Sequence, residues 1–248
     1  MDLELARHQW AAGRRAVEQA RFDPARYERL SQQVSVLVEE LTLRIGQTFT
    51  LEELRAIVDE AHRERHKVAS HAAALNGVHN SVEAGVDSIE HGFYISDPDL
   101  KSMAARGIYY VPTIFVGEYV AEGRAAAGAQ VWVDMINIHA RTFKRALDAG
   151  VKIAFGTDAG GFDWKIDPAR EFALLVKYGM TPAQALKSAT INAAELLGIE
   201  DQVGSLETGK FADIVAAPAD PMTDITQLEH VNFVMKGGEV VKSLASGR

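Results

Sequence analysis

The regular alternation of helical and strand-like segments after Thr50 constrains the fold of this chain most strongly. Short apolar runs rich in β-branched residues, typical of buried strands, occur at 67–70, 86–89, 108–114 and 151–155. A helical pattern precedes each run, and Gly85, Gly107 and Gly150 end the last three of these helices. Four consecutive helix–strand repeats with short connections predict a parallel sheet covered by helices. The fold class is therefore α/β.

The sequence divides into three predicted parts. The first part, residues 1–48, reads as a helical hairpin that ends at about residue 46. Its role is unassigned, and packing or dimerisation is expected. Residues 49–200 hold the strand–helix repeats, with further helices at about 131–149, 168–178 and 181–197. Residues 201–248 change to two-residue alternation, which predicts C-terminal β-strands at 212–216 and a hairpin turning at Gly237 and Gly238.

Composition narrows the functional classes. A chain of 248 residues with 47% hydrophobic and 24% charged residues is typical of a globular protein. Its net charge of −8 argues against nucleic acid as a partner, and no apolar run approaches the roughly 18 residues that a membrane span needs. Because the chain has no cysteine, a metal would need His, Asp, Glu or Lys ligands, and a cytoplasmic location is expected.

Three ionisable residues follow predicted strands. His71 follows the strand at 67–70, His91 follows 86–89, and Asp158 follows 151–155 in a run of small residues. The carboxyl ends of parallel strands meet at one edge, where α/β folds keep their chemistry. Two imidazoles and a carboxylate there predict a divalent-metal site, with Zn²⁺ as the expected ion. The alternative is that each residue caps its own strand end.

Other residues are weaker candidates for substrate contacts. Tyr110 and Thr113 belong to the third predicted strand, which would serve equally well as pure core. His139 lies in the long helix at 131–149 and points either toward the site or into the core or solvent. Gly160 belongs to a glycine-rich turn after Asp158, where small residues let the backbone approach a ligand.

From about Thr50 onward, roughly four fifths of the chain resembles the carboxyl-terminal half of an amidohydrolase-superfamily enzyme. The similarity is greatest to imidazolonepropionase-like and Xaa-Pro dipeptidase-like members. It is carried by the motifs VASH at 68–71, AGVDSIEHG at 84–92, YVPT at 110–113, AGVKIAFGTD at 149–158, ATINAAELLG at 189–198 and GSLETGKFADI at 204–214.

The resemblance implies strands five to eight of a TIM-type (β/α)8 barrel, followed by strands of a small β-sandwich. In the family, His71 and His91 would follow strands five and six and hold one metal. Asp158 would follow strand eight, bind a metal and act as the base for metal-bound water. A metal lowers the pKa of such water from 15.7 to about 7.

The chain also departs from the family pattern. The family's first strand carries a His-x-His pair and its fourth strand often carries a carbamylated lysine. No two histidines of this chain are separated by one residue, and its first lysine is Lys67, just before His71. The metal site is therefore expected to be incomplete.

Two hypotheses follow. In the first, the chain is a metal-dependent hydrolase that cleaves amide-type carbon–nitrogen bonds in dipeptides or cyclic amides. In the second, it is a catalytically inactive half-barrel with a structural role. Open sheet edges before the first and after the last strand would then favour self-association, for example as a symmetric homodimer.

Overall fold

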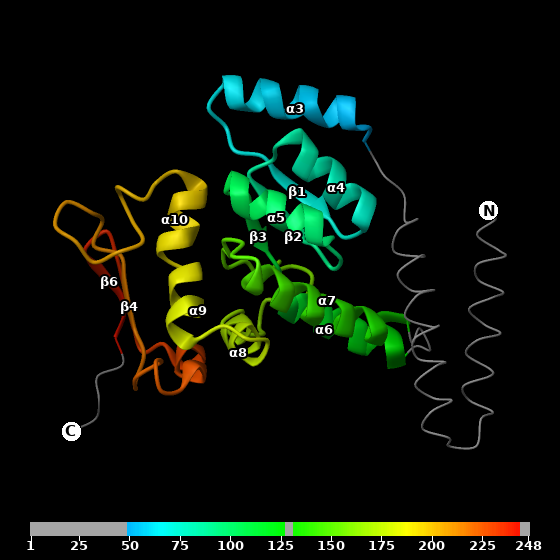
Figure 1. The fold of residues 1–248 in the computed structure, drawn as a ribbon. Coiled ribbons are helices and arrows are strands. Elements are labelled where there is room, and N and C mark those ends of the chain that lie inside the picture. Colours follow the sequence, from blue (N-terminus) through cyan, green and yellow to red (C-terminus); the bar gives the residue numbers. More distant parts are fainter. Residues whose placement is uncertain (1–48, 127–130, 244–248) are drawn as a thin grey trace, which may run out of the picture.

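The computed structural model of the protein describes residues 49–126 and 131–243, so the expected helical hairpin of residues 1–46 lies outside the described residues. Strands β1 (Ala69–Ala72), β2 (Ser88–His91) and β3 (Tyr109–Val111) form a parallel sheet in that order. As Figure 1 shows, helices separate successive strands along the chain. The parallel α/β architecture predicted from the sequence is confirmed for these three strands.

Helices make up most of the remaining described chain. They are α3 (Leu51–Arg63), α4 (Leu75–Ala84), α5 (Asp97–Arg106), α6 (Ile114–Ala126), α7 (Val131–Asp148), α8 (Arg170–Lys177), α9 (Pro182–Ser188) and α10 (Ile191–Leu197). Local chemistry sets several of their ends. Thr50 and Glu53 form a capping box at the start of α3, and Gly85 and Gly107 end α4 and α5 in left-handed conformations.

The fourth predicted strand is reduced to a single bridge. Within 151–155, only Ile153 pairs with the sheet, opposite Tyr110, and the described residues form no closed barrel. The side of this segment away from β3 has other partners, because the Asn192 side chain donates to the Ile153 carbonyl and Phe155 N–H donates to the Ser188 carbonyl. Groups from the α9–α10 region therefore occupy positions where a further strand would pair.

Three other expectations need adjustment. The predicted strand at 108–114 is shorter, because helix α6 begins at Ile114, and α6 itself was not predicted. The predicted helix at 181–197 is split near Thr190 into α9 and α10. His71 lies within β1 and His91 is the last residue of β2, so both histidines occupy strands rather than following them.

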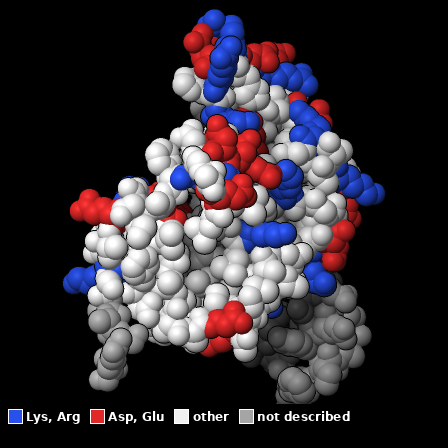
Figure 2. Space-filling model, turned by 90° about the vertical axis from the view of Figure 1, so that its left-hand side faces the viewer, with Lys and Arg blue, Asp and Glu red and all other residues white. Residues whose placement is uncertain are grey.

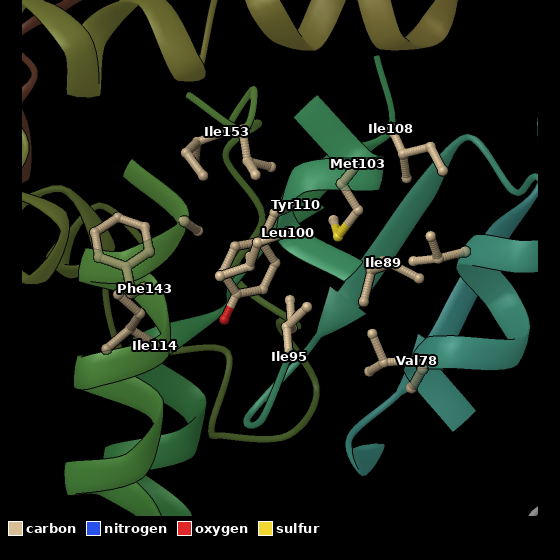
Figure 3. Packing of buried hydrophobic residues seen from close by; sticks show 14 of the residues in the cluster. Val78, Ile89, Ile95, Leu100, Met103, Ile108, Tyr110, Ile114, Phe143 and Ile153 are labelled. Carbon is tan, nitrogen blue, oxygen red and sulfur yellow. The ribbon is translucent and has the colours of Figure 1, made fainter. Parts of the chain in front are cut away.

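The main core lies between the sheet and the surrounding helices. Figure 3 shows Ile89, Ile95, Leu100 and Met103 close to the ring of Tyr110, and all five side chains are fully buried. A smaller cluster of Tyr109, Val111 and Ala154 forms separately, with Leu196 packed against it. Alternation along β3 explains the division, because Tyr110 points away from the face that carries Tyr109 and Val111.

The C-terminal region is a separate antiparallel sheet. It contains β4 (Ile214–Ala216), β5 (Phe233–Lys236) and β6 (Glu239–Ser243), with the 3-10 helix η1 (Ile225–His230) before β5. The β5–β6 hairpin turns at Gly237 and Gly238, as the sequence predicted. In Figure 1 this sheet lies on the far side of α9 and α10 from the parallel sheet.

Surface charge and helix hydropathy bear on whether the chain binds nucleic acid or a membrane. On the face drawn in Figure 2, acidic and basic side chains are interspersed among uncharged ones. Within the described residues, no helix has the length and hydropathy needed to cross a bilayer.

Candidate functional site

Two histidine rings meet at the carboxyl end of β1 and β2. The ring centroids of His71 and His91 are 4.5 Å apart with an interplanar angle of 69°. Register pairs His71 with Glu90 and Ala72 with His91, so a regular strand would point the two histidines toward opposite faces. His91 instead has a φ of 70°, and this departure from strand geometry accompanies the close approach of its ring to His71.

The structure holds His91 through both its ring and its backbone. His91 Nδ1 lies 2.7 Å from Thr113 Oγ1. The Tyr110 hydroxyl donates to the carbonyls of His91 and Gly92, each at 3.0 Å. Gly92 has a φ of 48°, and a Cβ there would lie 2.7 Å from Tyr110 Cε2. The end of β2 is therefore packed so closely that only glycine fits after His91.

Left-handed backbone conformations concentrate at this edge. Of the four described non-glycine residues with positive φ, three are His91, Thr113 (48°) and Asp158 (52°), and the fourth is Arg65 after α3. Such conformations cost about 1–3 kcal/mol each and persist where the surrounding structure enforces them, often at functional sites. The three residues follow or end neighbouring segments of one sheet, which supports a functional reading of this edge.

The ionisable groups at this edge interact electrostatically. Burial lowers the pKa of His91, the neighbouring His71 lowers it further, and the charge of Asp158 opposes them. Burial also raises the pKa of Glu90, against the hydrogen bond that Ser88 Oγ donates to Glu90 Oε1 at 2.6 Å. His71 and Asp158 both contribute to the pKa of Glu90. Two histidines and two carboxylates therefore share one electrostatic environment.

Glu90 was missed by the sequence analysis, although it lies within the AGVDSIEHG motif. The missing signal was strand alternation, because Glu90 is the register partner of His71 and so shares its face of the sheet. The motif by itself does not show this register, so Glu90 was not among the predicted site residues.

These residues do not form a complete metal centre. In the described parts of the chain, no group of three or more His, Cys, Asp or Glu side chains is arranged to hold a metal ion. His71 and His91 make a close pair, and Asp158 is near enough to influence His91, but the three are not assembled as one ligand set. A metal would need further ligands or a shift of Asp158 toward the two histidines.

The weaker candidates have different surroundings. Tyr110 is fully buried and bonds the backbone at the end of β2, so it contacts the site from the core side. His139 on α7 is buried with its ring 4.6 Å from that of Phe93, and burial lowers its pKa to about 3. Among the described residues its Nε2 has no hydrogen-bond partner. Gly160 is an exposed turn residue with a φ of 115°.

A largely apolar cavity of about 480 Å³ lies beside β1. It is lined by β1 residues including His71, by Phe49 just before α3, and by Leu54 and Ile57 of α3. The described residues place no strand on this side of β1, so the cavity opens at the free edge of the sheet. One of the two histidines therefore lies on an edge strand.

Comparison with known proteins decides the family. The amidohydrolase family profile matches residues 12–248, nearly the whole chain. The chain belongs to the amidohydrolase family. The match begins at residue 12, within the segment that the sequence analysis treated as a separate helical hairpin.

Several amidohydrolase relatives are enzymes. Ochratoxinase of Aspergillus niger is 32% identical over 212 residues, which cover 80% of this chain and 43% of the relative. Imidazolonepropionase of Geobacillus thermodenitrificans is 31% identical, over 78% of this chain and 44% of the relative. The crystal structure of a Xaa-Pro dipeptidase with bound methionine is 40% identical with a TM-score of 0.74, covering 79% of this chain and 49% of that one. The chain thus spans about half the length of these relatives.

Proposed function

We propose that this chain contributes part of the active site of a metal-dependent hydrolase that cleaves carbon–nitrogen bonds in small molecules. Amide, peptide and cyclic amide bonds are the expected substrates, and one of the similar solved structures is that of a Xaa-Pro dipeptidase. The observation that carries the proposal is the pairing of His71 with His91 next to Asp158 at the edge of a parallel sheet. In such hydrolases a bound Zn²⁺ supplies Lewis-acid chemistry and an activated water.

The residues of this chain support specific parts of that activity. The His71 and His91 imidazoles are suited to Zn²⁺, and a carboxylate such as Asp158 is suited to binding a metal or accepting a proton. We propose that Thr113 and Tyr110 act indirectly by fixing His91, and that Gly160 lies in a loop near the substrate. The two imidazoles need a further ligand, and a shift of Asp158 toward them would supply one within this chain.

Metal analysis of the purified chain tests this proposal. We expect one Zn²⁺ per chain by calorimetric titration and elemental analysis, with binding lost in His71→Ala and Asp158→Ala. His79→Ala is the matched control, because His79 is a half-exposed histidine on α4 that pairs with Asp99. A panel of Xaa-Pro dipeptides and cyclic amides then measures hydrolysis. A folded wild-type chain that binds no Zn²⁺ would refute the proposal.

A second candidate is a catalytically inactive, self-associating half-barrel. Two observations favour it: the described residues contain no complete ligand group, and the edge of β1 is free beside an apolar cavity. Unpaired strand edges are sites where a second chain adds by backbone hydrogen bonding.

Light scattering of two matched variants tests this second candidate. Ala69→Lys places a charge on the exposed edge strand β1, and Ala105→Lys places the same charge on the exposed surface of α5. If the β1 edge mediates association, wild type and Ala105→Lys form a dimer and Ala69→Lys is a monomer. A monomeric wild-type chain, or equal mass for all three proteins, excludes this interface.

A further inference from the structure

A buried carboxylate from α8 caps the start of α6. Glu171 is fully buried, and its Oε1 accepts the Ile114 N–H at 2.8 Å while Oε2 accepts the Phe115 N–H at 2.7 Å. These are the first two N–H groups of α6, which have no partner within that helix. The cap thus comes from a residue more than 50 positions away in the sequence.

The residue just before this cap contacts His91. Thr113 is buried, has a left-handed φ of 48°, and places its Oγ1 2.7 Å from His91 Nδ1. A threonine is β-branched, so this conformation is strained and persists only where neighbouring contacts hold both sides of it. β3 fixes the chain through Val111, and the Glu171 carboxylate fixes it from Ile114 onward.

We propose that Glu171 is a positioning residue for His91, acting through the first turn of α6 and the hydroxyl of Thr113. The inference builds on the proposed function, since His91 is one of the two histidines offered there. The Thr113 contact fixes the His91 ring, and with the proton on Nδ1 it leaves the lone pair of Nε2 available as a ligand. Glu171 itself contacts neither the histidines nor any substrate.

The burial of Glu171 distinguishes it from an ordinary helix cap. A neutral Gln, Ser or Thr satisfies helix N–H groups without removing a charge from water. Burial raises the pKa of Glu171 to about 7, the two N–H donors lower it, and the nearby Glu118 carboxylate raises it further. Glu118 is instead paired with Lys177 and Tyr178. Among the described residues, Glu171 makes no ion pair with Lys or Arg, so the two N–H groups of α6 are what stabilise its ionised form.

Nitrogen-15 NMR of the imidazole rings directly tests this relay, the path from Glu171 through the first turn of α6 and the Thr113 hydroxyl to His91. Glu171→Gln keeps the shape of the side chain but replaces one acceptor oxygen with a donor NH₂, so one N–H of α6 loses its partner. We expect the His91 ring signals to shift or broaden, and Thr113→Val, which removes the hydroxyl, to change the same signals. Glu118→Gln is the matched control, since it alters a neighbouring carboxylate that is not in the relay.

Unchanged His91 signals in a folded Glu171→Gln protein would overturn the proposal. If Glu171→Gln does not fold, Glu171→Asp carries the same comparison, because it keeps the charge and shortens the side chain by one methylene. If neither variant folds, Glu171 is a determinant of folding and the positioning role is rejected.

A second readout separates this inference from the proposed function. In a chain that binds Zn²⁺, Glu171→Gln should weaken the affinity about 10- to 100-fold, as expected for a residue that orients a ligand. If the His91 ring signals change in Glu171→Gln but the wild-type chain binds no Zn²⁺, the relay is supported and the metal-dependent function is refuted. If Zn²⁺ binding is lost in His71→Ala but the affinity is unchanged in Glu171→Gln, the metal-dependent function is supported and the relay is refuted.

Discussion

Replacing Gly92 with alanine should disturb the end of β2 in two ways that can be measured separately. Gly92 has a left-handed φ of 48°, which is unfavourable for any residue with a Cβ. An added Cβ would also lie 2.7 Å from Tyr110 Cε2 and 3.0 Å from Ile95 Cδ1, both in the buried core. The Tyr110 ring would have to move, and its hydroxyl donates to the His91 carbonyl.

The two effects have different sizes. A left-handed conformation costs an alanine about 1–2 kcal/mol, and overpacking a close-packed core adds about 1–3 kcal/mol. Gly107→Ala isolates the first effect, because Gly107 has a φ of 71° and no atom lies within 4 Å of an added Cβ. Gly156→Ala isolates the second effect, because the φ of Gly156 is not left-handed but an added Cβ would clash with Val111 Cγ1.

Urea unfolding of the three variants measures these contributions. We expect Gly92→Ala to lose about 1–3 kcal/mol more stability than Gly107→Ala, with the difference arising from the contact with Tyr110. The lower conformational entropy of an unfolded chain with alanine is common to both variants and cancels in the comparison. Equal losses for Gly92→Ala and Gly107→Ala would refute the claim that close packing against Tyr110 leaves room only for glycine after His91.

Three further predictions concern buried polar groups. Tyr110→Phe removes the donor to two backbone carbonyls and should cost about 1–3 kcal/mol in urea unfolding, whereas Tyr119→Phe on the exposed side of α6 should change stability by less than about 0.5 kcal/mol. Burial raises the pKa of Glu171 from 4.5 to about 7, so the folded state retains a proton that the unfolded state has lost. Its contribution to stability should fall by about 3 kcal/mol as pH rises from about 4.5 to about 7, and Glu171→Gln should remove this dependence in thermal scans. Burial lowers the pKa of His139 from 6.5 to about 3, so the unfolded state alone gains a proton as pH falls through that range and stability is lost. His139→Leu should remove this acid sensitivity and, because the imidazole also makes a hydrogen bond with the His91 backbone, should cost about 0.5–1.5 kcal/mol of stability at pH 7; an unchanged acid sensitivity would contradict this assignment.

The sequence predicted features that depend on neighbouring residues. Glycines with left-handed φ end α4 and α5, and the turn at Gly237 and Gly238 joins β5 to β6, as expected from local conformational preferences. The shared edge of the parallel strands also placed His71 and His91 at one end of the sheet, although the left-handed φ of His91 that accompanies the approach of the two rings was not predicted. These outcomes follow from periodicity and from the rule that parallel strands end on one side.

Contacts between distant segments were not predictable in the same way. Glu171 reads as an ordinary polar residue near the start of α8, and nothing nearby in the sequence shows that it caps α6. The segment around Ile153 reads as a strand, yet Asn192 and the Ser188 carbonyl bond to its backbone. Glu90 was overlooked because its role depends on its register with β1. Each case requires knowledge of which elements become neighbours.

The two histidines differ in how firmly the described structure holds them, and this difference bears on metal affinity. His91 is half-buried and fixed by Thr113 and Tyr110, whereas His71 is exposed on the edge strand β1. A ligand set with one exposed and less constrained member binds more weakly, because ordering that side chain opposes the binding free energy. Any partner that pairs with the free edge of β1 should therefore raise Zn²⁺ affinity by ordering His71, even without supplying a ligand. Zn²⁺ titration across the concentration range in which the chain associates tests this coupling, and an affinity independent of association would show that His71 is already ordered in the single chain.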